Sequence, residues 1–96
     1  MTVADITVQN VADYLRLSEL SAADTAFLGS ALSIAKAFIK DYTGQTEEFV
    51  NTSETFVAVV YVLCQDMYDT RALYVDKSNL NKLVDTILGM YAINLL

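Results

Sequence analysis

One feature restricts the possible folds of this chain more than any other. It is the run of nine consecutive apolar residues at positions 56–64, FVAVVYVLC. The four valines in this run would also suit a buried β-strand. However, the segment over residues 53–68 exceeds the usual strand length, and the chain offers no second strand to pair with it. We therefore expect a helix over residues 53–69. A helix that is apolar nearly all round is buried on most sides, so it lies at the centre of the fold or against another subunit.

Two helices are expected before this one, because apolar residues recur there at helical spacing. The first spans about residues 8–16, with Thr7 as its N-cap. The second spans about residues 21–43 and begins at Ser21, a favourable N-cap residue. Gly44 follows its last turn and predicts a left-handed C-cap.

A fourth helix is expected over residues 79–91, beginning after Ser78. Residues 45–52 lack helical spacing and are predicted to form a loop. The chain contains no proline, and no linker-like segment divides it. The sequence therefore predicts an all-α fold, a compact four-helix domain covering residues 1–96.

Composition limits the partners of such a domain. The apolar content is 54%, above the usual range of about 45–50%, which indicates self-association or a protein partner. The net charge is −6 and Lys and Arg form no cluster, so we expect neither sequence-specific nucleic-acid binding nor attachment to an anionic membrane. The longest apolar run has nine residues, against about 20 for a membrane span. The start of the chain does not resemble a signal peptide, and the single cysteine fits a cytoplasmic origin.

The residue types required for catalysis are sparse. The chain has no histidine, which removes the commonest general base and the usual partner of a nucleophilic Ser or Cys. Cys64 lies within the apolar run and is expected to be buried and unreactive. Residues 76–87 faintly resemble a calcium-binding loop, but Asn81 stands where the loop needs Gly and Ile87 stands where it needs Glu. We therefore expect no enzyme activity, no cofactor and no metal site.

The connection after the third helix carries an unusual set of polar residues. Asp66 and Asp69 lie at the C-terminal end of that helix, where the helix dipole disfavours acid. Arg71 could cap the last carbonyl groups and pair with Asp66 or Asp69, or it could pair with a carboxylate of another subunit. Tyr68 and Tyr74 flank the acidic connection, where each could lie at the core edge or on a contact surface.

Five motifs occur in an order that resembles the small head–tail connector (head completion or adaptor) proteins of tailed bacteriophages and prophages. The resemblance spans nearly the whole chain, and its last part is similar to the Gram-positive phage branch. One departure is the segment NTSET at 51–55, because many members have Pro at the start of the third helix. The motifs are Tyr14-Leu15-Arg16, Asp24, Tyr42-Thr43-Gly44, Tyr68-Asp69-Thr70-Arg71 and VDKSNLNKLVDTILGMY at 75–91.

The resemblance implies a structural virion protein made in the bacterial host cytoplasm. Such a protein is all-helical and assembles into a homo-oligomeric ring beneath the portal protein. The ring joins the portal vertex to the downstream tail-completion or stopper protein, and DNA passes through it during packaging. Residues expected to contact a neighbouring subunit or the portal are Asp66, Tyr68, Asp69, Arg71, Tyr74, Asp76, Tyr91, Ile93, Leu95 and Leu96.

A second interpretation needs no phage context. The same composition fits a small acidic helical regulator that binds another protein through the third helix or through the C-terminal tail YAINLL. A homo-oligomeric ring would distinguish the connector from this regulator.

Overall fold

The computed structural model describes residues 1–93 and shows an all-α fold over that range, without strands. The sequence prediction of an all-α protein is therefore confirmed. The elements in chain order are η1 (Val3–Asp5), α1 (Val8–Tyr14), α2 (Ala22–Thr43), α3 (Glu47–Thr52), α4 (Phe56–Thr70), η2 (Lys77–Asn79) and α5 (Lys82–Tyr91), where η denotes a 3₁₀ turn.

The predicted number of four helices is wrong, because residues 1–93 form five α-helices. The expected loop at 45–52 contains α3, whose N-cap Thr46 accepts a hydrogen bond from the backbone N–H of Phe49. The helix predicted from residue 53 begins at Phe56, since a separate turn follows α3. The helix predicted from residue 79 is shortened in the same way: η2 precedes it, and Asn81 rather than Ser78 is its N-cap.

Local capping chemistry fixes the start of α1 and both ends of α2 as the sequence predicts, whereas α1 ends at Tyr14, before the predicted end at residue 16. The Thr7 hydroxyl accepts a hydrogen bond from the Asn10 N–H at 3.1 Å, and the Ser21 hydroxyl accepts one from the Asp24 N–H at 3.0 Å. Gly44 ends α2 in the left-handed conformation, with φ of 71°. Each of these caps therefore acts within one turn of the helix end that it fixes.

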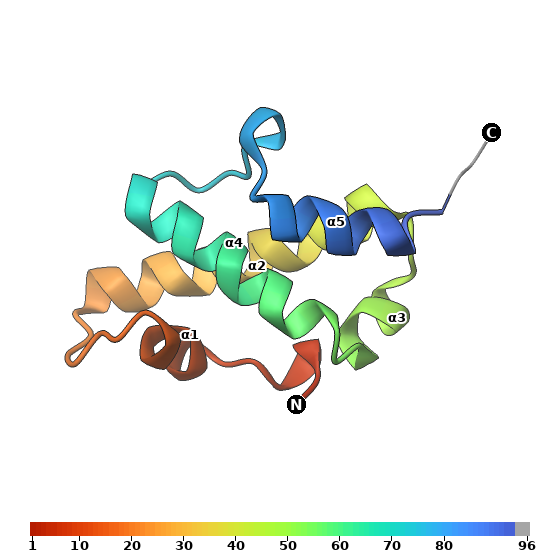
Figure 1. The fold of residues 1–96 in the computed structure, drawn as a ribbon. Helices are drawn as coiled ribbons and strands as arrows, with labels where there is room; N and C mark the ends of the chain where they lie inside the picture. The colour runs from red at the N-terminus through yellow and green to blue at the C-terminus, as the bar shows by residue number, and fades with distance from the viewer. Residues whose placement is uncertain (94–96) are drawn as a thin grey trace.

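The apolar helix α4 crosses α2 at the centre of the molecule (Figure 1), as its composition predicts. It also contacts η1, α1 and α5. Val59, Val60 and Cys64 are fully buried along its length. Burial raises the pKa of the Cys64 thiol to about 12, so the thiol stays protonated and behaves as a small apolar side chain.

Helix α2 is the only helix in the described part of the chain that is long and apolar enough to cross a membrane. This is weak evidence for a membrane span, because the core helix of a soluble protein passes the same test. In the structure, α2 places Leu28, Ala35 and Ile39 in the core and exposes Lys40 and Asp41.

Two hydrogen bonds hold the C-terminal end of α5 against the C-terminal end of α2. The side-chain amide of Gln45 donates to the carbonyl oxygen of Tyr91 at 2.7 Å, and the Ile93 N–H donates to the carbonyl oxygen of Thr43 at 2.7 Å. The resulting molecule is a flat slab of about 46 × 28 × 18 Å.

Candidate functional site

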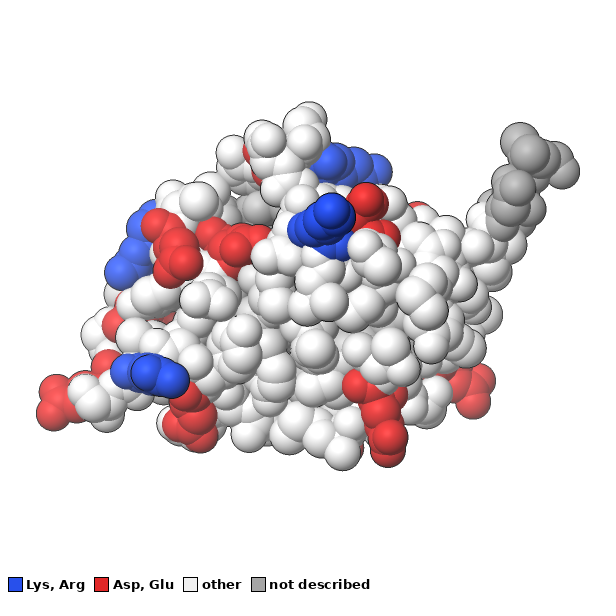
Figure 2. Space-filling view, in the orientation of Figure 1, with Lys and Arg blue, Asp and Glu red and all other residues white. Residues whose placement is uncertain are grey.

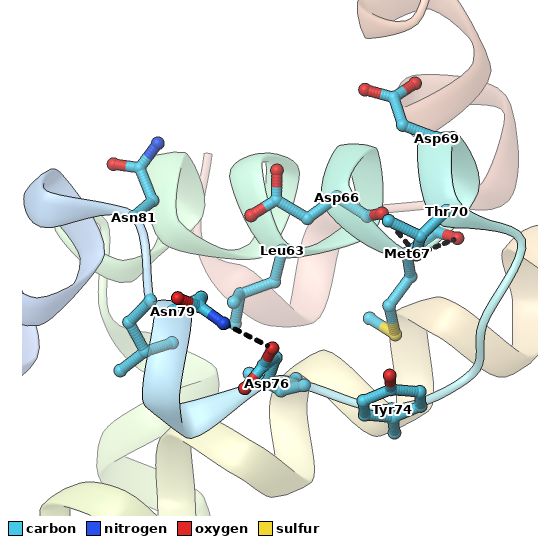
Figure 3. A pocket seen from close by; sticks show the side chains of 11 residues that line it. Leu63, Asp66, Met67, Asp69, Thr70, Tyr74, Asp76, Asn79 and Asn81 are labelled. Carbon is cyan, nitrogen blue, oxygen red and sulfur yellow. Dashed lines mark hydrogen bonds between the residues drawn. The ribbon is translucent and has the colours of Figure 1, made fainter.

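An open groove lies between the C-terminal half of α4 and the segment that leads to α5. We call it the acidic groove; its volume is about 350 Å³. Its apolar lining is formed by Leu63, Met67, Val75 and Leu80, and its polar lining by Asp66, Asp69, Thr70, Tyr74, Asp76, Asn79 and Asn81. Figure 3 shows these side chains arranged on both sides of the opening, with α4 on one side and η2 on the other.

The segment around η2 forms the side of the groove opposite α4. Hydrogen bonds between residues close in sequence hold this segment in place. The Asp76 carboxylate accepts hydrogen bonds from the backbone N–H of Ser78 at 3.0 Å and from the side-chain amide of Asn79 at 2.9 Å. Asn81 then caps α5 by accepting the N–H of Leu83 at 2.8 Å. Because two Asx turns follow each other here, η2 stands away from α4 and leaves the groove open.

The groove is acidic, and no Lys or Arg among the described residues lines it. Partial burial, and next the negative charge of Asp69, raise the pKa of Asp66 above its ordinary value. The pKa of Asp76 is lowered, because Asn79 and Ser78 donate hydrogen bonds to its ionised form. The C-terminal dipole of α4 adds further negative potential beside Asp66 and Asp69. Figure 2 shows acidic side chains on this face beside the hollow under η2, with basic side chains farther out on either side.

Arg71 does not pair with Asp66 or Asp69, so that prediction is wrong. Its guanidinium Nη1 atom lies 3.6 Å from the carboxylate of Asp24 on α2, and its Cζ atom lies 4.2 Å from the centre of the Tyr68 ring. Arg71 turns away because its backbone has φ of 55°, which ends α4 in the left-handed conformation. Within residues 1–93, no Lys or Arg forms an ion pair with the acids at the end of α4.

The other predicted contact residues do not all meet at this groove. Asp66, Asp69, Tyr74 and Asp76 come together there, whereas Tyr68 faces α2 and packs edge-on against Phe27. The remaining predicted contact residues belong to the C-terminal end of the chain.

At the C-terminal end, the ring of Tyr91 packs against aromatic residues of its own chain. Its ring lies 5.2 Å from that of the buried Phe56 and 6.3 Å from that of Phe49. Ile93 is partly exposed beside Gly44. The predicted contact residues Leu95 and Leu96 lie outside the described residues.

Sequence reasoning missed the two asparagines of the groove, Asn79 and Asn81. The signal was present in the run DKSNLN at 76–81, because Asp, Ser and Asn at this spacing favour Asx turns. Within residues 1–93, no three His, Cys, Asp or Glu side chains are placed to hold a metal ion.

Comparisons with protein-family models, with curated proteins and with solved structures find no match to this chain.

Proposed function

We propose that this protein is a structural head–tail connector of a tailed phage virion. It would assemble into a homo-oligomeric ring that joins the portal vertex to the next tail-completion or stopper protein, with DNA passing through the ring. The ordered motifs from Tyr14-Leu15-Arg16 to the segment 75–91 support this assignment by resemblance. The proposal includes no enzymatic step and no cofactor.

The observation that carries the proposal is the apolar surface around the acidic groove. Leu73, Tyr74 and Leu83 are 44%, 64% and 51% exposed, and all three lie in or next to the segments that form the groove. Large apolar side chains beside a concave surface are typical of a protein–protein contact. Such a surface supports a protein that works by joining other chains.

The charge distribution is consistent with a passage for DNA. The net charge is −6, and a ring with this charge would repel the phosphate backbone instead of binding it. Rapid passage of a genome requires weak contact with the wall. This argument supports the connector over a protein that holds nucleic acid.

Native mass spectrometry and negative-stain electron microscopy would test the proposal. The chain is examined alone and with the portal protein encoded in the same genome, and we expect rings or attachment to the portal. A chain that stays monomeric and does not bind the portal at micromolar concentrations would contradict the proposal and favour the small acidic regulator.

A variant pair makes the test specific to the groove. Leu73→Ser combined with Tyr74→Ser should weaken assembly or portal attachment. Tyr14→Ser is the control, because Tyr14 is also 44% exposed but lies on α1, where it stacks on Tyr61 at 4.9 Å. Equal losses in both variants would show that the groove has no special part in the contact.

A further inference from the structure

A second surface of this chain carries positive charge, whereas the acidic groove carries negative charge. Lys36 and Lys40 lie one turn apart on α2 and line a hollow of about 320 Å³, which α2 forms with α3. Glu47 lines the same hollow, so the formal charge of the hollow is +1. We call this surface the lysine hollow.

We propose that the acidic groove of one copy receives Lys36 and Lys40 of a second copy in a head-to-tail contact. The inference rests on the proposed function and names the contact between neighbouring subunits.

First, both surfaces carry charges that the single chain leaves without partners. Within residues 1–93, the one ion pair closer than 4.0 Å joins Arg71 to Asp24, so it involves neither surface. Asp66 and Asp69 occupy a helix C-terminus, where acid is locally unfavourable. Positions at which a sequence breaks a local folding rule are often functional, and a cation from another chain would offset this cost.

Second, the spacing of the two sets of charges matches. Lys36 and Lys40 are four residues apart on one helix, and Asp66 and Asp69 are three residues apart on another. Both spacings place side chains on one face with Cβ atoms about 5–6 Å apart. Two ammonium groups can therefore meet two carboxylates at once. The groove is also wide enough for long side chains, since its volume is about 350 Å³.

Third, apolar side chains lie beside both surfaces. Tyr74 lines the groove and is 64% exposed, and the exposed Ala37 lines the lysine hollow. A contact that surrounds ion pairs with apolar side chains excludes water and strengthens the charge interaction.

The contact has a direction, because the acidic groove and the lysine hollow share no residue. Each copy then presents one groove and one pair of lysines, so a second copy leaves both kinds of surface open at the ends. Repeated contacts of this type close into a ring or continue as a filament. A two-fold symmetric dimer would require one self-complementary surface instead.

Two charge-reversal variants test the contact. The groove variant carries Asp66→Lys and Asp69→Lys, and the lysine variant carries Lys36→Glu and Lys40→Glu. Analytical ultracentrifugation should show that each variant alone associates at least about 100-fold more weakly than the wild-type chain, because like charges then face each other. An equimolar mixture should associate again, since every contact in an alternating assembly pairs opposite charges.

The matched control carries Glu19→Lys and Glu54→Lys, which change the net charge as much as the groove variant but lie outside both surfaces. It should associate like the wild-type chain, and circular dichroism should show the same fold for all variants. A lysine variant that associates normally, or a mixture that stays monomeric, would overturn the contact. A wild-type chain that is monomeric at millimolar concentration would overturn it too.

Portal binding separates this inference from the proposed function. If the wild-type chain binds the portal while charge reversal leaves its self-association unchanged, the contact is wrong and the connector stands. If charge reversal abolishes self-association but the wild-type chain ignores the portal, the contact stands and the connector is wrong.

Discussion

Arg71 ends α4 at a backbone conformation that is costly for any residue with a β-carbon. At φ of 55°, the cost relative to a right-handed residue is about 1–2 kcal/mol. Contacts of the guanidinium with the Tyr68 ring and the Asp24 carboxylate offset part of it. The same residue therefore ends α4 and joins its end to α2.

The two contributions of Arg71 can be separated by two substitutions. Arg71→Ala removes both contacts and keeps the strain, so we expect the free energy of unfolding to fall by about 1 kcal/mol. Arg71→Gly removes the same contacts but relieves the strain, and it should stay within about 0.5 kcal/mol of wild type. Urea denaturation measures both. A glycine variant no more stable than the alanine variant would show that the backbone is not strained.

Asp66 is expected to destabilise the isolated chain at neutral pH. Its pKa is raised in the folded state, so the native protein holds the proton more tightly than the unfolded chain does. The free energy of unfolding therefore falls as the pH rises through the ordinary value of 3.8 toward the raised pKa. Below 3.8 the effect is absent, because both states are protonated.

Replacing this carboxylate by an amide tests the sign. Asp66→Asn should raise the free energy of unfolding by about 0.5 kcal/mol at pH 7, since an uncharged side chain no longer opposes the dipole of α4. The gain should disappear as the pH falls below 3.8. Denaturation curves at both pH values provide the measurement, and a loss of stability at pH 7 would contradict the expected sign.

At the scale of the elements, the sequence was most informative where a helix end depends on nearby residues. Thr7, Ser21 and Gly44 were predicted correctly, because each acts within one turn of its own position. The helix α3 was missed although Thr46 and the two acids that follow it are good start signals. This helix has six residues and buries only Val50, so its sequence shows no helical repeat of apolar residues that would predict it.

The acidic groove could be predicted only in part for the same reason. Asp66, Asp69 and Asp76 were candidates because the local sequence makes them unusual. The partner of Arg71 could not be found, because Asp24 is distant in the chain and reaches Arg71 only through the packing of α2 on α4. Which side of α4 faces the groove is likewise decided by tertiary packing.

The packing of α5 leads to a prediction about the C-terminal end. Tyr91→Ala removes a ring that packs on Phe56 and Phe49, and the free energy of unfolding should fall by about 2–3 kcal/mol. This is less than for a fully buried aromatic residue, because Tyr91 is partly exposed. Thermal or urea denaturation measures the loss.

Met90→Ala is the matched control for this substitution. Met90 is the neighbouring residue on α5 and is 74% exposed, so its truncation should change stability by no more than about 0.5 kcal/mol. If Tyr91→Ala left stability unchanged and weakened assembly, Tyr91 would belong to a contact surface, as the sequence first suggested.

At the scale of the whole molecule, two electrostatic effects oppose each other. The net charge of −6 makes two copies repel each other at long range, whereas the proposed contact between the acidic groove and the lysine hollow attracts them at short range. Salt screens both effects, but it screens the long-range repulsion first, because the Debye length is about 30 Å at 0.01 M and about 8 Å at 0.15 M.

The association of wild-type copies should therefore depend on salt in two phases. From 0.01 to about 0.15 M salt, screening of the net repulsion should strengthen association or leave it unchanged. Toward 1 M, where the Debye length is about 3 Å, partly exposed ion pairs between copies should weaken and association should fall about tenfold or more. Sedimentation velocity across this range measures the effect. Association that strengthens steadily up to 1 M would instead show that the apolar residues beside the groove, and not its carboxylates, hold the copies together.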